Sequence, residues 1–248
     1  MKRLVDIFAS ALGLVVLSPV LVLVAVAIWL QDYRSPFYIA SRTGRGDRPF
    51  RMLKFRSMVV SADRSGVDST AGDDPRITVV GRFIRKFKLD EVPQLWNVLR
   101  GEMSLVGPRP NVWRETLLYT AEEKGLLAVR PGITDLASVV FSDEAEILHG
   151  SDDPDLEYNQ VIRPWKSRLG LLYVHRGGGV FLDLRLIYLT LLNAFARPKA
   201  LAAVAGIVTQ LGGSEQLRQA SLRSAPLQAA PPPGASEIVR GREIPLVA

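Results

Sequence analysis

The chain begins with a long apolar segment that carries no charge. No Asp, Glu, Lys or Arg lies between Asp6 and Asp32, and Ile7–Leu30 spans 24 residues. As a straight helix this segment would be about 36 Å long, enough to cross a hydrocarbon core of about 30 Å. Three structures fit the pattern: a spanning helix, a helix that enters and leaves the membrane on one side, and a signal peptide cleaved near Ala25–Ala27.

The middle of this segment contains Ser18 and Pro19. Proline removes one backbone hydrogen bond and clashes with the carbonyl four residues back, so we expect the helix to bend there. Each arm is then about 16 Å long, too short to cross a bilayer alone, and Ser18 can satisfy a freed backbone group. Basic residues flank the segment on both sides, which favours both ends on the cytoplasmic side. A re-entrant helix over residues 1–33 and a kinked spanning helix are both compatible with these features.

Beyond residue 33 the pattern changes to short elements joined by connectors rich in glycine and proline. Apolar residues at 37–40 and 50–55 flank a turn-rich stretch and predict a strand pair, whereas the polar residues 59–75 predict a loop. The expected fold class of residues 34–196 is therefore α+β, largely helical, with a small β-hairpin. Helices are predicted at 76–88, from Pro93 to Val98, and at 115–129.

The last part of the chain is apolar at first and then rich in proline. Residues 183–195 predict either a buried helix or an amphipathic helix lying in the membrane surface, and 201–211 form a weaker candidate of the same kind. From Gly212 onward Pro, Ala, Ser and Gln dominate, which predicts disorder. We expect residues 197–248 to form an extension that is weakly helical and then disordered. A chain ending near Gly212 should then keep its activity.

The amino-acid composition excludes several kinds of site. The chain has 248 residues, of which 48% are apolar, enough for a hydrophobic core. It contains no Cys, so disulfides, thiolate zinc sites and cysteine nucleophiles are excluded. Its two histidines, His149 and His175, are too few for a metal site built from several imidazoles.

Positive charge is concentrated in one region. The whole chain has a net charge of +6, but residues 34–114 alone hold 16 Lys and Arg against eight Asp and Glu, a net charge of +8. Such a density indicates a polyanionic partner, either a phosphorylated substrate, an anionic membrane or a nucleic acid. A solvated basic face without a partner gives the same pattern.

The densest candidate chemistry lies at 85–110. Asp90 and Glu91 are adjacent, directly precede a predicted helix start and lie inside the basic region. Two carboxylates suit a magnesium ion that is also bound by substrate phosphate, and nearby arginines can hold phosphate with two parallel hydrogen bonds. By themselves, two acids before a helix are more commonly explained by helix capping and compensation of the helix dipole.

Several stretches of sequence occur together in a characteristic order. They are KFRSM at 54–58, DPRIT at 74–78, LDEVPQLWNVLRGEMSLVGPRP at 89–110 and RPGIT at 130–134, preceded by Lys2, Arg3, the apolar segment and Ser18-Pro19. In this order and spacing, residues 1–196 resemble the bacterial sugar transferase family, the monotopic polyprenyl-phosphate phosphoglycosyl transferases. The resemblance favours the re-entrant form of the first helix, with Ser18 and Pro19 at its break.

The resemblance implies a two-step reaction on the cytoplasmic face of the bacterial inner membrane. Asp90 would attack a UDP-sugar, hold the phosphosugar covalently and pass it to undecaprenyl (polyprenyl) phosphate, which begins exopolysaccharide, O-antigen or other glycoconjugate synthesis. It also implies magnesium, held by Asp90 and Glu91, a lipid bilayer as partner, a possible homodimer and no nucleic-acid partner. Glu91 would serve as metal ligand or acid/base partner. The residues expected to bind substrate phosphate are Arg109, Arg85, Lys54, Arg56 and Arg76, with Asp74 near the site.

One stretch departs from the family pattern. After the RPGIT stretch, many relatives continue with Gly-Trp-Ala-Gln-Val, whereas this chain has Asp135–Val139, with the sequence DLASV, a difference that bears on recognition of sugar and nucleotide. Two other functions remain alternatives: a magnesium-dependent phosphohydrolase using the same two acids, and a membrane-anchored nucleic-acid-binding module. Against the latter, Phe83, Phe87 and Trp96 lie at helical spacing and are interpreted as core residues.

Overall fold

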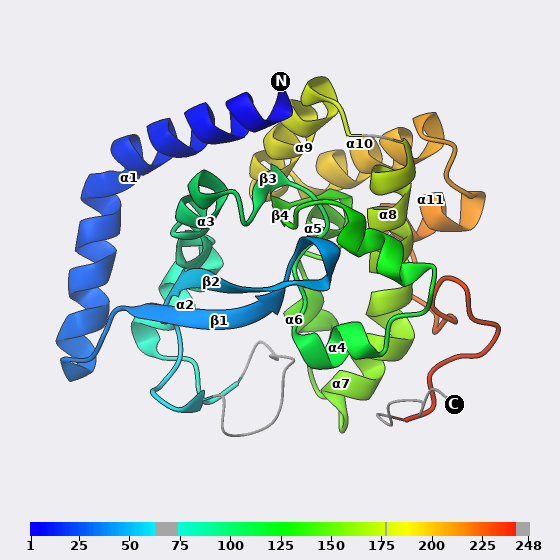
Figure 1. The fold of residues 1–248 in the computed structure, drawn as a ribbon. Coiled ribbons are helices and arrows are strands. Elements are labelled where there is room, and N and C mark those ends of the chain that lie inside the picture. The colour runs from blue at the N-terminus through cyan, green and yellow to red at the C-terminus, as the bar shows by residue number, and fades with distance from the viewer. Residues whose placement is uncertain (63–73, 177, 242–248) are drawn as a thin grey trace.

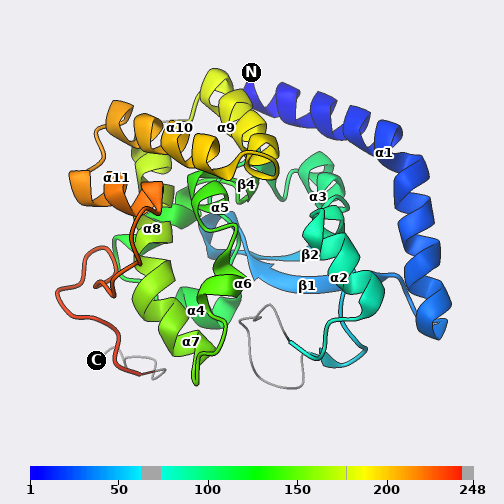
Figure 2. The ribbon, with the colours of Figure 1, turned by 180° about the vertical axis from the view of Figure 1, so that it is seen from behind.

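Helices form most of the protein, and small sheets lie among them (Figure 1). Helix α1 (Lys2–Asp32) lies along one side, and the helices from α8 (Arg163–Arg176) to α11 (Glu215–Leu222) form the other. The predicted strand pair is confirmed as the antiparallel hairpin of β1 (Phe37–Thr43) and β2 (Pro49–Phe55), which lies between the two sides (Figure 2). The computed structural model describes residues 1–62, 74–176 and 178–241.

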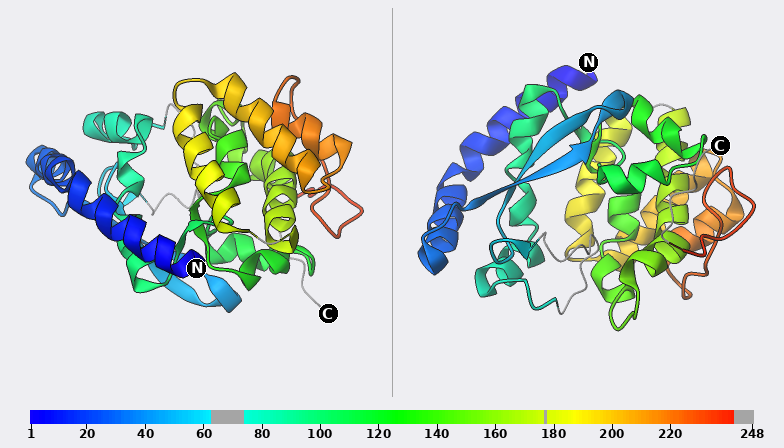
Figure 3. Two further views of the ribbon diagram at one scale, coloured as in Figure 1. Left: turned by 90° about the horizontal axis from the view of Figure 1, so that it is seen from above. Right: turned by 60° about the horizontal axis from the view of Figure 1, so that its bottom comes forward.

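Helix α1 bends near its middle into two arms (Figures 1 and 3), and Pro19 lies inside this helix. The hydroxyl of Ser18 donates to the carbonyl of Val15 at 2.8 Å. The Val15 carbonyl lies four residues before Pro19. In a regular helix it would accept the amide of residue 19, but proline has no amide hydrogen to donate. The predicted kink and the predicted role of Ser18 are thus confirmed. Within the described residues α1 is the one helix long and apolar enough to cross a membrane.

The first arm of α1 is bound to the rest of the protein by partly buried polar contacts. Lys2 donates to the Val106 carbonyl at 2.9 Å and pairs with Asp183. Arg3 donates to the carbonyls of Val98 and Leu99, at 2.6 and 2.9 Å. These contacts fix the amino terminus against the same domain that carries the hairpin.

The second arm ends in an ion pair. Asp32 accepts from both terminal nitrogens of Arg56, with Nη2 at 2.6 Å from Oδ1. Because Arg56 follows directly after β2, this pair ties the carboxyl end of α1 to the hairpin. Both ends of the apolar helix therefore contact one domain.

Three short helical elements follow the hairpin: α2 (Val79–Lys86), the 3-10 turn η3 (Leu89–Glu91) and α3 (Gln94–Arg100). The Thr78 hydroxyl begins α2 by accepting from the Gly81 amide at 2.9 Å. The helix predicted at 76–88 is confirmed in its centre, and so is the one opened by Pro93. The predicted loop 59–75 lies largely outside the described residues.

The aromatic residues of this region face outward. The interpretation of Phe83, Phe87 and Trp96 as core residues is wrong, because they are 58%, 56% and 51% exposed. The helices instead bury other positions, Ile84 of α2 and Val98 of α3, both fully inaccessible to solvent. Periodicity marks a helical stripe, but it does not say which stripe meets the core.

The prediction of one continuous helix over 115–129 is wrong. The chain forms α4 (Trp113–Leu117) and then the separate 3-10 segment η4 (Glu123–Ala128). Thr120 and Glu123 cap this new start reciprocally: the Glu123 amide donates to the Thr120 hydroxyl, and the Thr120 amide donates to the Glu123 carboxylate, both at 3.1 Å. Such a capping box begins a helical segment, so it interrupts the preceding one.

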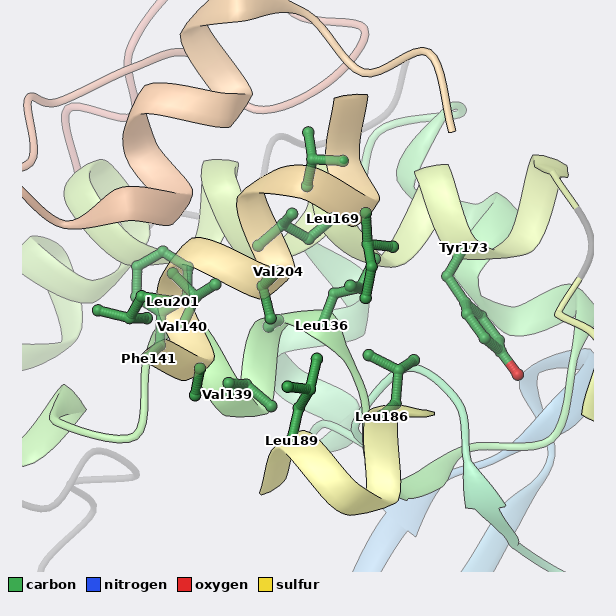
Figure 4. Close-up of a cluster of buried hydrophobic side chains, with 14 of the residues drawn as sticks. Leu136, Val139, Val140, Phe141, Leu169, Tyr173, Leu186, Leu189, Leu201 and Val204 are labelled. Atoms are coloured by element: carbon green, nitrogen blue, oxygen red, sulfur yellow. The ribbon is translucent and has the colours of Figure 1, made fainter. Parts of the chain in front are cut away.

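The main hydrophobic core lies around the short helix α5 (Leu136–Val140), whose Leu136, Val139 and Val140 are fully buried (Figure 4). Helix α8, which the sequence patterns do not predict, packs against α5 although Arg163, Lys166 and Arg168 interrupt its apolar pattern. Next to the core run two parallel strands, β3 (Ser104–Val106) and β4 (Gly132–Thr134). The remaining elements are α6 (Glu144–Ile147), α7 (Pro154–Glu157), the π turn η5 (Tyr158–Ile162), α9 (Val180–Asn193) and α10 (Arg197–Gln210).

The carboxyl-terminal extension is part of this core, and the prediction of disorder from Gly212 is wrong as far as residue 241. Helix α10 buries Leu201, Val204 and Ile207, and α11 buries Leu217. The chain then crosses α8 and η5, where its backbone bonds with them: the Ala230 amide donates to the Gln160 carbonyl at 3.0 Å. Composition alone missed these contacts because a few well-placed apolar residues suffice for docking on an existing core.

We expect a chain ending at Gly212 to be less stable than the full chain. It lacks Leu217, whose burial contributes about 2 kcal/mol, and the ion pair between Arg223 and Asp143 at 3.0 Å. The measurement is the midpoint of thermal unfolding in detergent, with a chain ending at Gly241 as control. Equal midpoints for the two chains would contradict the packing described above.

Candidate active site

Asp90 and Glu91 lie on the 3-10 turn η3, between α2 and α3. Lys88 begins this turn in the left-handed backbone conformation, with φ 56°, which separates it from α2. Pro93 then precedes the first residue of α3. The expectation that both acids directly precede a helix start is confirmed.

Glu91 is held by two cations. Arg109 donates to both of its oxygens, through Nη1 at 3.1 Å and through a closer contact of Nη2, and Lys54 lies 3.5 Å away. Burial by itself would raise the pKa of Glu91, but the attraction of Arg109 and Lys54 outweighs it and holds that pKa far below its usual range. Both oxygens of Glu91 therefore orient the guanidinium of Arg109.

Asp90 is in a different state from its neighbour. It is 8% exposed, and its Oδ1 is buried with no hydrogen-bond partner among the described residues. Burial and the adjacent charge of Glu91 raise the pKa of Asp90, while Lys54, Arg85 and Arg109 act in the opposite direction. A buried carboxylate oxygen without a partner, surrounded by cations, is poised to meet an electrophile or a metal ion.

Lys54 reaches the acids from strand β2. Burial lowers its pKa to about 8, although the charge of Glu91 opposes this shift. Below that pH it is a cation whose hydration shell is largely removed, and such a cation attracts phosphate more strongly than one in bulk water.

The other predicted phosphate ligands are further out. Arg85 of α2 is half-buried and near enough to Asp90 to lower its pKa. Arg56 is paired with Asp32, and Arg76 binds Asp74 at 2.6 Å. All three arginines line one cavity with the acids. The structure thus brings Lys54, Glu91 and Arg109 into direct contact around Asp90, and puts Arg56 and Arg76 in ion pairs of their own.

The cavity has a volume of about 1370 Å³ and extends well beyond the two acids. One side is reached by Leu17 of α1, next to the helix break, and another is formed by α5, α6 and α8. Sequence reasoning did not identify the polar residues of that second side, Glu144 and Lys166, which form an ion pair. Asp135, noted only as part of the departure from the family pattern, caps α5 by accepting from the Ser138 amide at 2.6 Å. An Asp three residues before a Ser was the available signal of such a cap.

The donor set around Asp90 fits a hard divalent cation only in part. In the described ranges no group of three or more His, Asp or Glu side chains converges. A magnesium ion can be held by one or two carboxylates when phosphate oxygens and water complete its shell. The unpartnered oxygen of Asp90, beside Glu91, meets that requirement.

Comparison with known proteins gives matches over most of the chain. The family model described as bacterial sugar transferase matches residues 1–197. A UDP-glucose:undecaprenyl-phosphate glucose-1-phosphate transferase of Klebsiella pneumoniae is 36% identical over 203 residues, covering 80% of this chain and 41% of the relative. An undecaprenyl-phosphate glucose phosphotransferase of Komagataeibacter xylinus is 39% identical over 202 residues, covering 77% of this chain and 35% of the relative.

A shorter relative matches as well. The exopolysaccharide production protein ExoY of Sinorhizobium fredii is 41% identical over 150 residues, which cover 54% of this chain and 66% of the relative. The chain thus spans less than half the length of the first two relatives and about two thirds of this one.

Proposed function

Since this chain belongs to the bacterial sugar transferase family, we propose that it transfers a sugar-1-phosphate from a UDP-sugar to undecaprenyl phosphate. The observation that carries the proposal is the buried, unpartnered Oδ1 of Asp90 among Lys54, Arg85 and Arg109. These residues face a cavity large enough for a nucleotide sugar.

In the first step, Oδ1 of Asp90 attacks the β-phosphorus of the UDP-sugar. A phosphorus–oxygen bond forms, the bond from that phosphorus to the oxygen bridging to the α-phosphate breaks, and UMP leaves with the electron pair. The approach of a carboxylate to a diphosphate brings negative charges together. Lys54, Arg85 and Arg109 offset that repulsion, and they do so in a partly desolvated site where their field is strong.

In the second step, a phosphate oxygen of the polyprenyl acceptor attacks the same phosphorus. The bond to Asp90 breaks, which regenerates the carboxylate and yields a polyprenyl diphosphate sugar. Arg109 and Lys54 lower the pKa of Glu91, which favours its carboxylate form. Glu91 keeps the planar group of Arg109 aimed at the position of the reacting phosphate.

Asp90 and Glu91 would also hold a magnesium ion in this site. Magnesium, when bound, supplies positive charge to the phosphate oxygens and so favours departure of UMP. The fit rests on the adjacent carboxylates of Asp90 and Glu91 and on donor phosphates as further ligands.

We further propose that the protein lies on the cytoplasmic face of the bacterial inner membrane, with α1 as a re-entrant helix. Lys2 and Asp32, at opposite ends of α1, bind the same domain, which a helix crossing the bilayer cannot do. Leu12, Val16 and Leu23 are 53–70% exposed along its apolar arms.

Other exposed apolar stripes suit the plane of the same membrane. On α9, a stripe at helical spacing is exposed between Phe181 and Phe195, which are 90% and 92% accessible. On α2, Val79, Phe83 and Phe87 form a second stripe. We assign both helices an interfacial position, where aromatic side chains are favoured. The cavity reaches Leu17 beside the helix break, so a lipid acceptor can enter from the bilayer.

The topology can be tested with single cysteines, because the chain has none of its own. One cysteine is inserted after Met1, and another replaces the exposed Ser41. In intact cells we expect an impermeant thiol reagent to label neither, because both lie on the cytoplasmic side. Pro19→Ala should favour a straight helix and expose the first position. Labelling of the inserted cysteine alone in the unaltered helix would overturn the re-entrant form.

The proposed activity is tested with purified protein, undecaprenyl phosphate, magnesium and a panel of UDP-sugars, with UMP release as the readout. We expect UMP release that requires one particular sugar and stops after one turnover when the lipid is omitted. Continued hydrolysis without lipid would instead support a phosphohydrolase. Salt-sensitive DNA binding without UMP release would support a nucleic-acid-binding module.

A further inference from the structure

Two arginines converge on one carboxylate. Arg197 is the last residue matched by the family model, and Arg223 lies beyond the match. Nη2 of Arg197, in α10, lies 2.8 Å from Oδ2 of Asp143, and Nη2 of Arg223, directly after α11, lies 3.0 Å from the same oxygen. Asp143 is distant from both in sequence and immediately precedes α6. We call these three residues the Asp143 clamp.

The clamp holds the whole connection between α5 and α6. Arg197 also donates to the Ser142 hydroxyl and, at 3.3 Å, to the Val140 carbonyl. The guanidinium of Arg223 lies over the ring of Phe141, 5.7 Å from its centre. Every residue from Val140 to Asp143 is therefore contacted by one of the two arginines.

This connection needs outside support. Helices α5 and α6 have five and four residues, and helices this short are not stable by themselves. Asp143 is the residue from which α6 starts, since its carbonyl accepts the amides of Glu146 and Ile147, at 2.8 and 3.0 Å. Fixing Asp143 thus fixes the first turn of α6.

The clamped connection is a wall of the cavity. Phe141, Ser142 and Glu144 all line it, and Glu144 is joined to Lys166 on the neighbouring helix α8. Glu91, the direct partner of Arg109, raises the pKa of Arg109 most, and Glu144 raises it further. This wall therefore lies within electrostatic reach of the reacting residues.

The chemistry of this wall differs from that of the basic side. The wall is lined by Ser138, Ser142 and Glu144, whereas the ring of Phe141 is buried in the main core and the carboxylate of Asp135 is bound to Ser138. Carboxylates repel phosphate, whereas hydroxyls and carboxylates bind sugar hydroxyls. The phosphates of a donor therefore belong at Lys54 and Arg109, and its sugar and nucleoside at this wall.

We propose that Arg197 and Arg223 are positioning residues that set the affinity for the sugar and nucleoside portion of the donor, by holding the wall formed by residues 140–144. The inference rests on the proposed transferase function. It gives the extension after residue 197 a part in substrate binding that the chain segment matched by the family model does not supply.

The test compares Arg223→Ala with Arg218→Ala. Arg218 is also an arginine of α11, but among the described residues its ion pair is the local one with Glu215 at 2.6 Å, and it does not line the cavity. We expect Arg223→Ala to raise KM for the UDP-sugar about tenfold, the order expected from losing a charged hydrogen bond. The expected kcat stays within about twofold, because Asp90 and its cations are untouched. Arg223→Lys should restore part of the affinity, and Arg197→Ala should repeat the effect.

A second readout does not depend on activity. Hydrogen exchange of the backbone amides at 144–148 should be faster in Arg223→Ala than in Arg218→Ala. If the two variants differ in thermal midpoint, the exchange rates are first corrected for global unfolding. Unchanged KM and unchanged exchange in Arg223→Ala would overturn the inference while the wild type remains active. If the wild type releases no UMP from any donor, the proposed function fails instead, and the exchange data alone decide whether the clamp holds the wall.

Discussion

Asp90→Asn is expected to reduce UMP release to background, a loss of more than about 10⁴-fold. The substitution keeps the size and shape of the side chain but removes the charge of the attacking oxygen. That oxygen, Oδ1, is buried and has no hydrogen-bond partner in the described structure, so the substitution breaks no hydrogen bond at that atom. The measurement is UMP release with the preferred donor, accompanied by the mass of the intact protein after brief exposure to donor without lipid.

The mass measurement distinguishes the mechanisms. Wild type should gain one phosphosugar, located on the peptide that contains Asp90, and Asp90→Asn should gain none. Glu91→Gln is the neighbouring control: it should loosen Arg109 and lower the rate, yet still allow the adduct. Arg109→Lys keeps the charge but loses the two parallel hydrogen bonds, so it should slow turnover without abolishing it. An adduct on Glu91, or none in wild type, would contradict the assigned roles.

Glu123→Gln is expected to destabilise the protein by about 3–5 kcal/mol, the usual cost of leaving one member of a buried ion pair without its partner. Glu123 and Arg163 are 0% and 2% exposed, and they form two hydrogen bonds, of which the Nε contact is 3.0 Å. Ser167 donates to Glu123 at 2.7 Å, and the Tyr119 ring covers the guanidinium. The network joins η4 to α8, and its members Tyr119, Arg163 and Ser167 line the cavity.

Thermal or denaturant unfolding in detergent measures this effect, with the exposed neighbour Glu122→Gln as control. The control should change stability by less than about 0.5 kcal/mol. The double variant Glu123→Met with Arg163→Met should be less destabilised than the sum of its single variants, because no charge is left buried. A midpoint for Glu123→Gln equal to that of the control would show that the pair is solvated rather than buried.

The sequence by itself determined the features that depend on near neighbours. Pro19 cannot donate a hydrogen bond wherever it lies in a helix, so the bend of α1 and the contact of Ser18 with Val15 were predictable. Apolar residues on both sides of a turn-rich stretch predicted the hairpin. Pro93 predicted the helix start beside Asp90, and the run of motifs from residue 54 to 134 predicted the family.

Only the tertiary structure decided which charged residues are buried and which proline-rich residues are ordered. Arg163 breaks the apolar pattern of α8, yet it is buried because Glu123, 40 positions earlier, satisfies it. Arg223 reads as part of a polar tail, yet it meets Asp143, 80 positions earlier. Burial of a charge is favourable only where a partner is brought to it. Such partners are supplied by the fold rather than by neighbouring positions, so the wall of the cavity and the order of the extension follow from long-range packing.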